Sequence, residues 1–143
     1  MKKMNIVLGS LLVVFALAAG ILPAFTDCWS QGRSLTTTTG KIVPMKCHWT
    51  AIAELSIAIP LGLAGIFTIF SKTKEARRVI GLLGIVLGAL VILFPTYLIG
   101  VCANPNMDCN KIMKPGLILT GGLAVVACAV LLFNSFRLKE PAA

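Results

Sequence analysis

The sequence predicts an all-α membrane protein in which one domain, residues 1–143, folds as an antiparallel bundle of four transmembrane helices. Hydrophobic residues make up 57% of the chain and the mean hydropathy is +0.93, which is typical of an integral membrane protein. A helix needs about 20 apolar residues to cross a bilayer. Four continuously apolar segments meet this requirement: residues 5–25, 48–70, 79–101 and 115–136.

Basic residues indicate which side of the membrane each end of these segments faces. Thirteen residues are Lys or Arg. Those on the side of both termini are Lys2, Lys3, Lys72, Lys74, Arg77, Arg78, Arg137 and Lys139. Those in the two opposite loops, residues 26–47 and 102–114, are Arg33, Lys41, Lys46, Lys111 and Lys114. Because cytoplasmic loops are enriched in Lys and Arg, we expect both termini to be cytoplasmic. Topology and headgroup contact then explain the net charge of +8, and we expect no nucleic-acid binding.

The first segment, residues 5–25, follows a basic start as a secretory signal would, but its apolar run is longer than a signal core. We therefore expect it to be retained as a helix. Gly9, Ala16 and Pro23 recur every seven residues, which places small residues on one face. Such a face allows close contact with a neighbouring transmembrane helix.

The second segment, residues 48–70, begins beside the sequence Pro44-Met45-Lys46-Cys47-His48-Trp49-Thr50. Trp49 is typical of the headgroup region of a membrane. Glu54 follows Cys47 by nearly two helical turns, so it lies roughly 10 Å further along the same face. A carboxylate inside a membrane is costly and is normally paired or functional. We expect Glu54 to face the bundle interior, where it handles protons or cations or pairs with one of four bases: Lys46, His48, Lys111 or Lys114.

The third segment, residues 79–101, is joined to the second by a short basic turn, which makes these two helices antiparallel neighbours. Gly81 and Gly88 lie on a seven-residue stripe that continues to Cys102, so this inward-packing face leads to an outer cysteine. The fourth segment, residues 115–136, starts with a proline, which suits the first turn of a helix.

Four of the five cysteines lie in the two outer loops, and the fifth, Cys128, lies in the fourth segment, where we expect it to be a packing residue. Disulfides persist in oxidising compartments, so this distribution agrees with the predicted topology. We expect two structural disulfides that staple the outer loops into an extracytoplasmic cap. Their members are Cys28, Cys47, Cys102 and Cys109. Four cysteines permit three pairings, and the sequence does not choose among them.

The outer loops also offer ligands for a soft metal, Cu(I) or Zn(II), which bind thiolate, thioether or imidazole groups. The candidate ligands are Met45, Cys47, His48, Met107 and Cys109. This alternative needs free thiolates and is therefore incompatible with intact disulfides. A third alternative is a thiol–disulfide relay, similar in outline to quinone-linked membrane enzymes that reoxidise thiol oxidases. Those enzymes use a Cys-x-x-Cys pair, which this sequence lacks.

One combination of motifs resembles a family of small four-helix prokaryotic membrane proteins known as a domain of unknown function. It consists of the Met-Lys-Cys-His-Trp-Thr sequence at residues 45–50, Cys102 and Cys109 in the second outer loop, and Lys114-Pro115-Gly116. The resemblance implies the four-helix fold and a location in the prokaryotic plasma membrane, the cell inner membrane. Because such proteins are encoded near export-type ABC transporters, it also implies an accessory role. It implies no activity.

The sequence contains no nucleotide-binding motif or nucleophile elbow, so we do not expect an enzyme. We predict an accessory or interaction protein of the lipid bilayer, without a cofactor, that associates with a larger membrane protein such as a transporter or with further copies of itself. The candidate functional residues are Glu54, His48, Cys47 and Trp49. The alternative is a protein that handles thiol redox with a quinone, or copper or zinc, through the outer Cys, His and Met residues.

Overall fold

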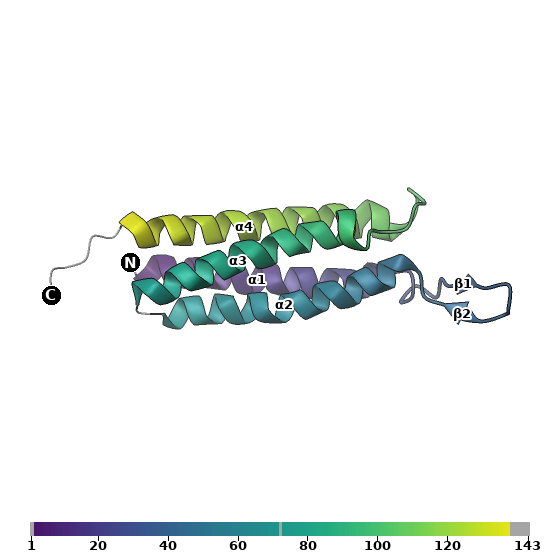
Figure 1. Ribbon diagram of the computed structural model, residues 1–143, viewed down its shortest axis with the longest axis horizontal. Coiled ribbons are helices and arrows are strands. Elements are labelled where there is room, and N and C mark those ends of the chain that lie inside the picture. Colours follow the sequence, from purple (N-terminus) through teal and green to yellow (C-terminus); the bar gives the residue numbers. More distant parts are fainter. Residues whose placement is uncertain (1, 72, 138–143) are drawn as a thin grey trace.

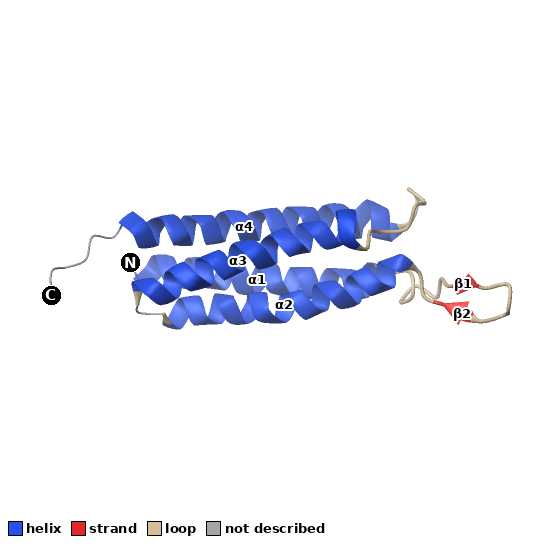
Figure 2. Ribbon diagram, viewed as in Figure 1, coloured by secondary structure: helices blue, strands red, loops and turns tan. Residues whose placement is uncertain are grey.

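The computed structural model describes residues 2–71 and 73–137. Four long α-helices run side by side along the molecule, as Figures 1 and 2 show. They are α1 (Lys2–Thr26), α2 (Lys46–Phe70), α3 (Lys74–Leu93) and α4 (Lys114–Arg137). Each lies in a span long and apolar enough to cross a membrane. The prediction of a multi-pass four-helix membrane protein is therefore confirmed. Two of the basic residues used to predict its orientation, Lys72 and Lys139, lie outside the described residues.

Helix α1 packs most extensively on α2, and α3 packs most extensively on α4. Glycines make both contacts possible. A Cβ atom at Gly65 would lie 2.9 Å from the carbonyl oxygen of Gly9, and one at Gly121 would lie 2.8 Å from that of Gly88. Because these positions carry no side chains, the helix backbones approach closely and gain van der Waals contacts. These contacts stabilise helix association in a bilayer, where no hydrophobic driving force acts between helices.

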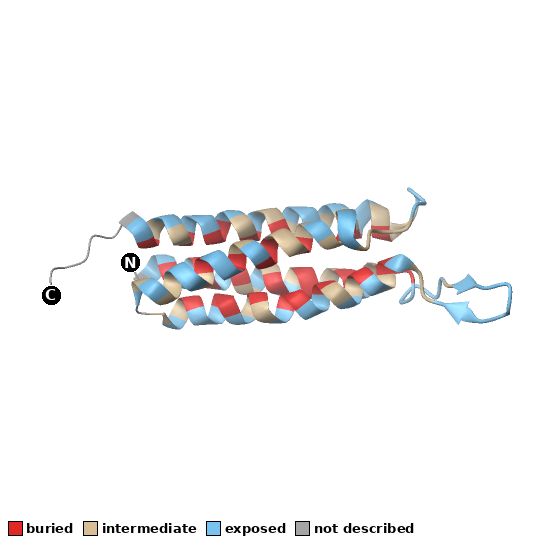
Figure 3. Ribbon diagram, viewed as in Figure 1, coloured by how far each residue is buried: buried red, intermediate tan, exposed pale blue. Residues whose placement is uncertain are grey.

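The outward faces of the four helices are apolar, and Figure 3 shows their exposed residues along the whole length of the bundle. Examples are Leu17, Ile59, Leu63 and Leu119, which are all exposed. Because lipid tails are as apolar as these side chains, their exposure is compatible with a bilayer.

The third helix differs in its bounds from the predicted segment, residues 79–101. Its α-helical part starts earlier, at Lys74, and ends at Leu93, where the π-helical turn η1 (Phe94–Leu98) follows. Pro95 lacks a backbone N–H, and beyond it the N–H groups of Ile99 and Gly100 both donate to the carbonyl oxygen of Phe94. Gly100 then turns the chain with a φ of +80°, a conformation that favours glycine.

A second π-helical turn, η2 (Cys109–Met113), leads directly into α4. The loop before η2 and the loop between α1 and α2 lie at the same end of the bundle, opposite the start of α1 and the end of α4 in Figure 1. We call this the cap end. The first of these loops also carries a short antiparallel hairpin, β1 (Leu35–Thr36) and β2 (Ile42–Val43), which projects beyond the helices.

Candidate functional site

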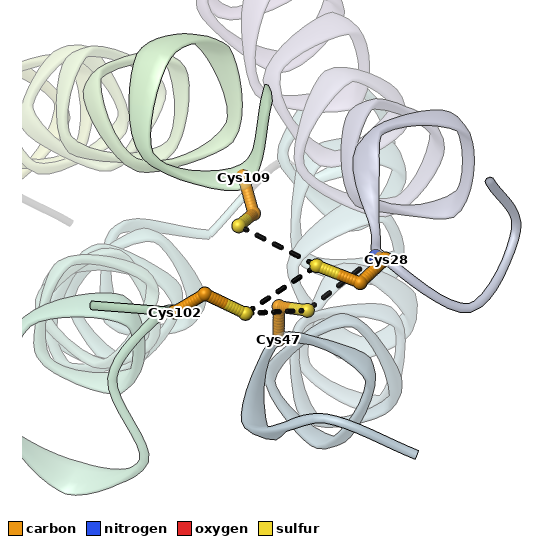
Figure 4. A group of neighbouring side chains, drawn as sticks. All are labelled: Cys28, Cys47, Cys102 and Cys109. Carbon is orange, nitrogen blue, oxygen red and sulfur yellow. Dashed lines mark hydrogen bonds between the residues drawn. The ribbon is translucent and has the colours of Figure 1, made fainter. Parts of the chain in front are cut away.

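Four cysteines from four different places in the chain meet at the cap end (Figure 4). Cys28 follows α1, Cys47 lies in the first turn of α2, Cys102 follows η1, and Cys109 begins η2. Their Sγ atoms all lie within 4.8 Å of one another. We call this group the cysteine tetrad. Because every helix, or the turn attached to it, supplies one member, the tetrad depends on the packing of the whole bundle.

The short sulfur–sulfur contacts inside the tetrad run between the two loops, and within the first loop the backbone N–H of Cys28 donates to the Sγ atom of Cys47 at 3.4 Å. The Sγ atom of Cys102 lies 3.3 Å from the Sγ atoms of both Cys28 and Cys47. The Sγ atom of Cys28 lies 3.7 Å from that of Cys109. Cys28, Cys47 and Cys109 are at most 2% exposed, whereas Cys102 is half-buried. The tetrad is therefore closed on most sides and reachable at one member.

The structure does not show the predicted disulfide-stapled cap. Its sulfur separations exceed the roughly 2.05 Å of a disulfide bond, and all five cysteines, each among the described residues, are free thiols. The sequence left open how the four outer cysteines pair. The bundle brings all four to one point, where the short Sγ–Sγ contacts join cysteines of different loops.

Sulfur separations in the tetrad are close to those of a tetrahedral metal site. Four thiolates that bind one ion at about 2.3 Å lie about 3.8 Å from one another. Burial raises the pKa of the Cys28 thiol, and contacts with the thiols of Cys47, Cys102 and Cys109 raise it further. Four adjacent thiolates would repel one another without a cation, so the thiolate form of this group requires a positive charge at its centre.

Two methionines add thioether sulfurs to the tetrad. The Sδ atom of Met45 lies 3.8 Å from the Sγ atom of Cys102, and the Sδ atom of Met107 lies 4.0 Å from that of Cys28. Four of the five ligands suggested by the sequence therefore lie in one cluster of six sulfurs. Cys28 and Cys102, which the sequence suggested only as disulfide partners, lie in it as well. The even number of outer cysteines, beside two methionines, is the sequence feature from which these two cysteines could have been predicted as members of the cluster.

His48, the fifth suggested ligand, is engaged elsewhere. Its Nδ1 donates to the Oδ2 atom of Asp27 at 2.8 Å, and its ring lies 5.7 Å from the ring of Trp29. Burial by itself would raise the pKa of Asp27, but hydrogen bonds from Ser30 and His48 outweigh it and lower that pKa. Asp27 is not among the residues that the sequence suggests, because its role depends on the meeting of two distant segments. The Asp27–His48 pair ties the end of α1 to the start of α2.

The Asp27–His48 pair also lines a pocket of about 300 Å³ between α1 and α2, together with Trp29 and Ser30. No cysteine belongs to its lining. Trp49, another candidate residue, is exposed at the cap end of α2. It lies at an end of the span, where tryptophan is typical of the headgroup region.

Glu54 is fully buried, and neither of its carboxylate oxygens has a hydrogen-bond partner among the described residues. The expected pairing with a nearby base is therefore absent. Lys46 and Lys111 are exposed, and His48 donates to Asp27 instead. Glu54 remains a polar group within an apolar bundle.

The neighbouring Thr50 is better satisfied than Glu54. Its hydroxyl donates to the carbonyl oxygen of Gly100 at 2.7 Å, and the residue is fully buried. Because Gly100 lies two residues before Cys102, this hydrogen bond fixes the loop that carries the half-buried member of the tetrad.

Comparison with known proteins identifies one related family. The model of a family described as a domain of unknown function (DUF4418) matches residues 5–134. No curated protein and no solved structure shows significant similarity to the chain.

Proposed function

This chain belongs to the DUF4418 family of domains of unknown function, and we propose that it is a membrane protein that binds a soft metal ion at its cysteine tetrad. The observation that carries the proposal is the mutual approach of four Sγ atoms to within 4.8 Å. Tetrahedral sites made of four thiolates are typical of zinc and of iron–sulfur centres, and thiolates also select Cu(I). Copper and zinc are therefore the metals we propose.

A tetrad with four protein ligands leaves no open coordination position. Catalytic zinc sites keep such a position for water or substrate, whereas closed sites are structural. The half-buried Cys102 also gives solvent a route to one ligand, which suits exchange of the metal with a carrier. We therefore propose a non-enzymatic role in holding or transferring the metal.

We place the cap end outside the cytoplasm, as the distribution of basic residues indicates. An accessory role beside a larger membrane protein such as a transporter agrees with the exposed apolar side chains of the projecting hairpin, Leu35 and Ile42. Purification in mild detergent after chemical crosslinking tests this association. Recovery of the chain alone from crosslinked native membranes would contradict it.

The metal proposal is tested on protein purified in detergent, reduced and kept anaerobic. We expect about one Zn(II) or Co(II) per chain, with the absorption spectrum of a tetrahedral thiolate site for Co(II). Serine at Cys28, Cys47 or Cys109 should abolish this spectrum. Cys128→Ser is the matched control, because Cys128 is an equally buried cysteine on α4 outside the tetrad, and it should leave the spectrum unchanged.

Two results would contradict the metal proposal. One is fully reduced protein, with five titratable thiols after denaturation, that binds no Zn(II), Co(II) or Cu(I). The other is a metal stoichiometry that stays the same when tetrad cysteines are replaced.

Thiol redox chemistry is the second candidate, favoured by the continuous line of sulfur contacts from Cys47 through Cys102 and Cys28 to Cys109. Along such a line, a disulfide formed by one pair can exchange with a neighbouring thiol. Alkylation before and after mild reduction, on protein isolated from membranes, counts the free thiols. A disulfide that forms and exchanges reversibly would favour this candidate, with a quinone as one possible oxidant.

A further inference from the structure

A pocket of about 340 Å³ opens beside the tetrad at the cap end. Among the residues that line it are Met45, Lys46, Cys102, Asn104 and Met107. Cys102 is the tetrad member in this lining, and it is also the tetrad member that is not fully buried. An ion that reaches the tetrad through this pocket therefore meets Cys102 before the other three thiols.

The two methionines stand beside different members of the tetrad. Met45 has its Sδ atom 3.8 Å from the Sγ atom of Cys102, and Met107 has its Sδ atom 4.0 Å from the Sγ atom of Cys28. Both side chains are half-buried, so each lies between the pocket and the thiols. We call this pocket the methionine vestibule.

Its chemistry discriminates among metals. Thioether sulfur is a soft, neutral ligand that suits Cu(I), whereas Zn(II) is bound by thiolate, imidazole or carboxylate groups. The lining contains no Asp, Glu or His, and it includes the basic residue Lys46. A divalent ion in water therefore finds no carboxylate to attract it and one positive charge that repels it. Cu(I) carries a single charge, and a carrier delivers it with soft or anionic ligands. The missing carboxylates and the charge of Lys46 therefore hinder Cu(I) less than they hinder a divalent ion.

We propose that the methionine vestibule is the site at which Cu(I) is taken up and passed to the tetrad. This inference rests on the proposed metal-binding function and names its ion. Cu(I) first binds the thioethers of Met45 and Met107 as its carrier dissociates. Bonds to Cys102 and then to Cys28 form while the copper–thioether bonds break, each coordinating thiol releases its proton to solvent, and the copper stays Cu(I) throughout.

The test compares Met45→Leu, Met107→Leu and the double variant with the unchanged protein. Leucine is close to methionine in volume but lacks the sulfur, so packing is largely kept. Cu(I) is supplied anaerobically as a coloured chelator complex, and its transfer is followed by the loss of colour. We expect the double variant to take up Cu(I) about tenfold more slowly or worse, by analogy with the loss of other groups that support metal ligands. Co(II) binding at the tetrad should remain.

Met4→Leu is the matched control, because Met4 lies near the start of α1, at the end of the bundle opposite the tetrad. It should load Cu(I) at the unchanged rate. Intact Co(II) spectra in all variants would show that the tetrad is folded.

Two results would overturn the vestibule. One is an unchanged Cu(I) transfer rate in the double variant. The other is a parallel loss of Co(II) and Cu(I) binding, which would mean that the methionines only shape the tetrad. Failure of the underlying function is distinguishable, because the unchanged protein would then bind neither Co(II) nor Cu(I).

Discussion

Replacing Glu54 by leucine should stabilise the folded bundle by about 1 kcal/mol, which is what remains of the roughly 1–3 kcal/mol cost of a buried polar group without a partner once the cost of repacking is subtracted. Glu54 is fully buried, and both carboxylate oxygens lack a hydrogen-bond partner among the described residues. Leucine differs moderately in shape, and swaps of similar volume usually cost less than about 1.5 kcal/mol. The relief of the unpartnered carboxyl group therefore exceeds the expected packing cost.

The assay is reversible unfolding in detergent, followed by far-ultraviolet circular dichroism, for Glu54→Leu and Glu54→Gln. The glutamine variant keeps an unpartnered polar group of the same size, so its free energy of unfolding should change by less than about 0.5 kcal/mol. Ser56→Leu is the control for adding a leucine to α2, since Ser56 is exposed on the same helix and its hydroxyl donates to the carbonyl oxygen of Ile52 one turn earlier. It should also change stability little.

A decrease of more than about 1 kcal/mol in the free energy of unfolding of Glu54→Leu, without such a decrease in Ser56→Leu, would contradict this prediction. That result would mean that the carboxyl group gains a favourable partner in the membrane, such as a bound cation or a water molecule that shares a proton. Glu54 would then be a candidate functional residue, because charged groups inside membranes often have a function.

Other perturbations test the packing and the chemistry of the cap end. Gly84→Ala should destabilise the bundle by about 1 kcal/mol, because the added Cβ meets the Cys128 Sγ atom and overpacking outweighs the gain in helix propensity. In a Cys128→Ala background the same change should cost no stability. Equal losses of stability in both backgrounds would contradict a role of this contact. Thr50→Val should cost about 1–2 kcal/mol and weaken Co(II) binding, because the carbonyl oxygen of Gly100 loses its donor; unfolding and Co(II) titrations check both effects. Co(II) affinity should fall as the pH is lowered, since binding displaces thiol protons and the pKa of Cys28 is already raised. Competition titrations at several pH values measure this affinity, and a value that does not change with pH would contradict binding by four thiolates.

Local sequence patterns could not predict which of the outer cysteines contact one another. The sequence permits three pairings of the four outer cysteines and does not choose among them. The observed short contacts of Cys102 reach across to the other loop, at 3.3 Å, because the two loops converge over one bundle. No periodicity within a single segment encodes that convergence.

His48 and Glu54 illustrate the same limit. Both were recognised as unusual from their types and positions, since a lone histidine at the membrane surface and an acid inside it stand out in any apolar chain. Their partners were not recognised. Asp27 lies twenty-one residues before His48 and meets it only when α1 and α2 pack. Glu54 meets no partner among the described residues; of the expected bases, Lys46 and Lys111 are exposed and His48 is bonded to Asp27.

The number of membrane spans, their approximate bounds and the end at which the outer cysteines and methionines lie can be predicted from the sequence alone. These properties depend on local hydropathy and helical spacing, which each segment carries alone. That four thiols and two thioethers share one site is seen only once the helices are packed together. That arrangement depends on how antiparallel helices align their ends, and close glycine contacts such as Gly9 with Gly65 set this alignment.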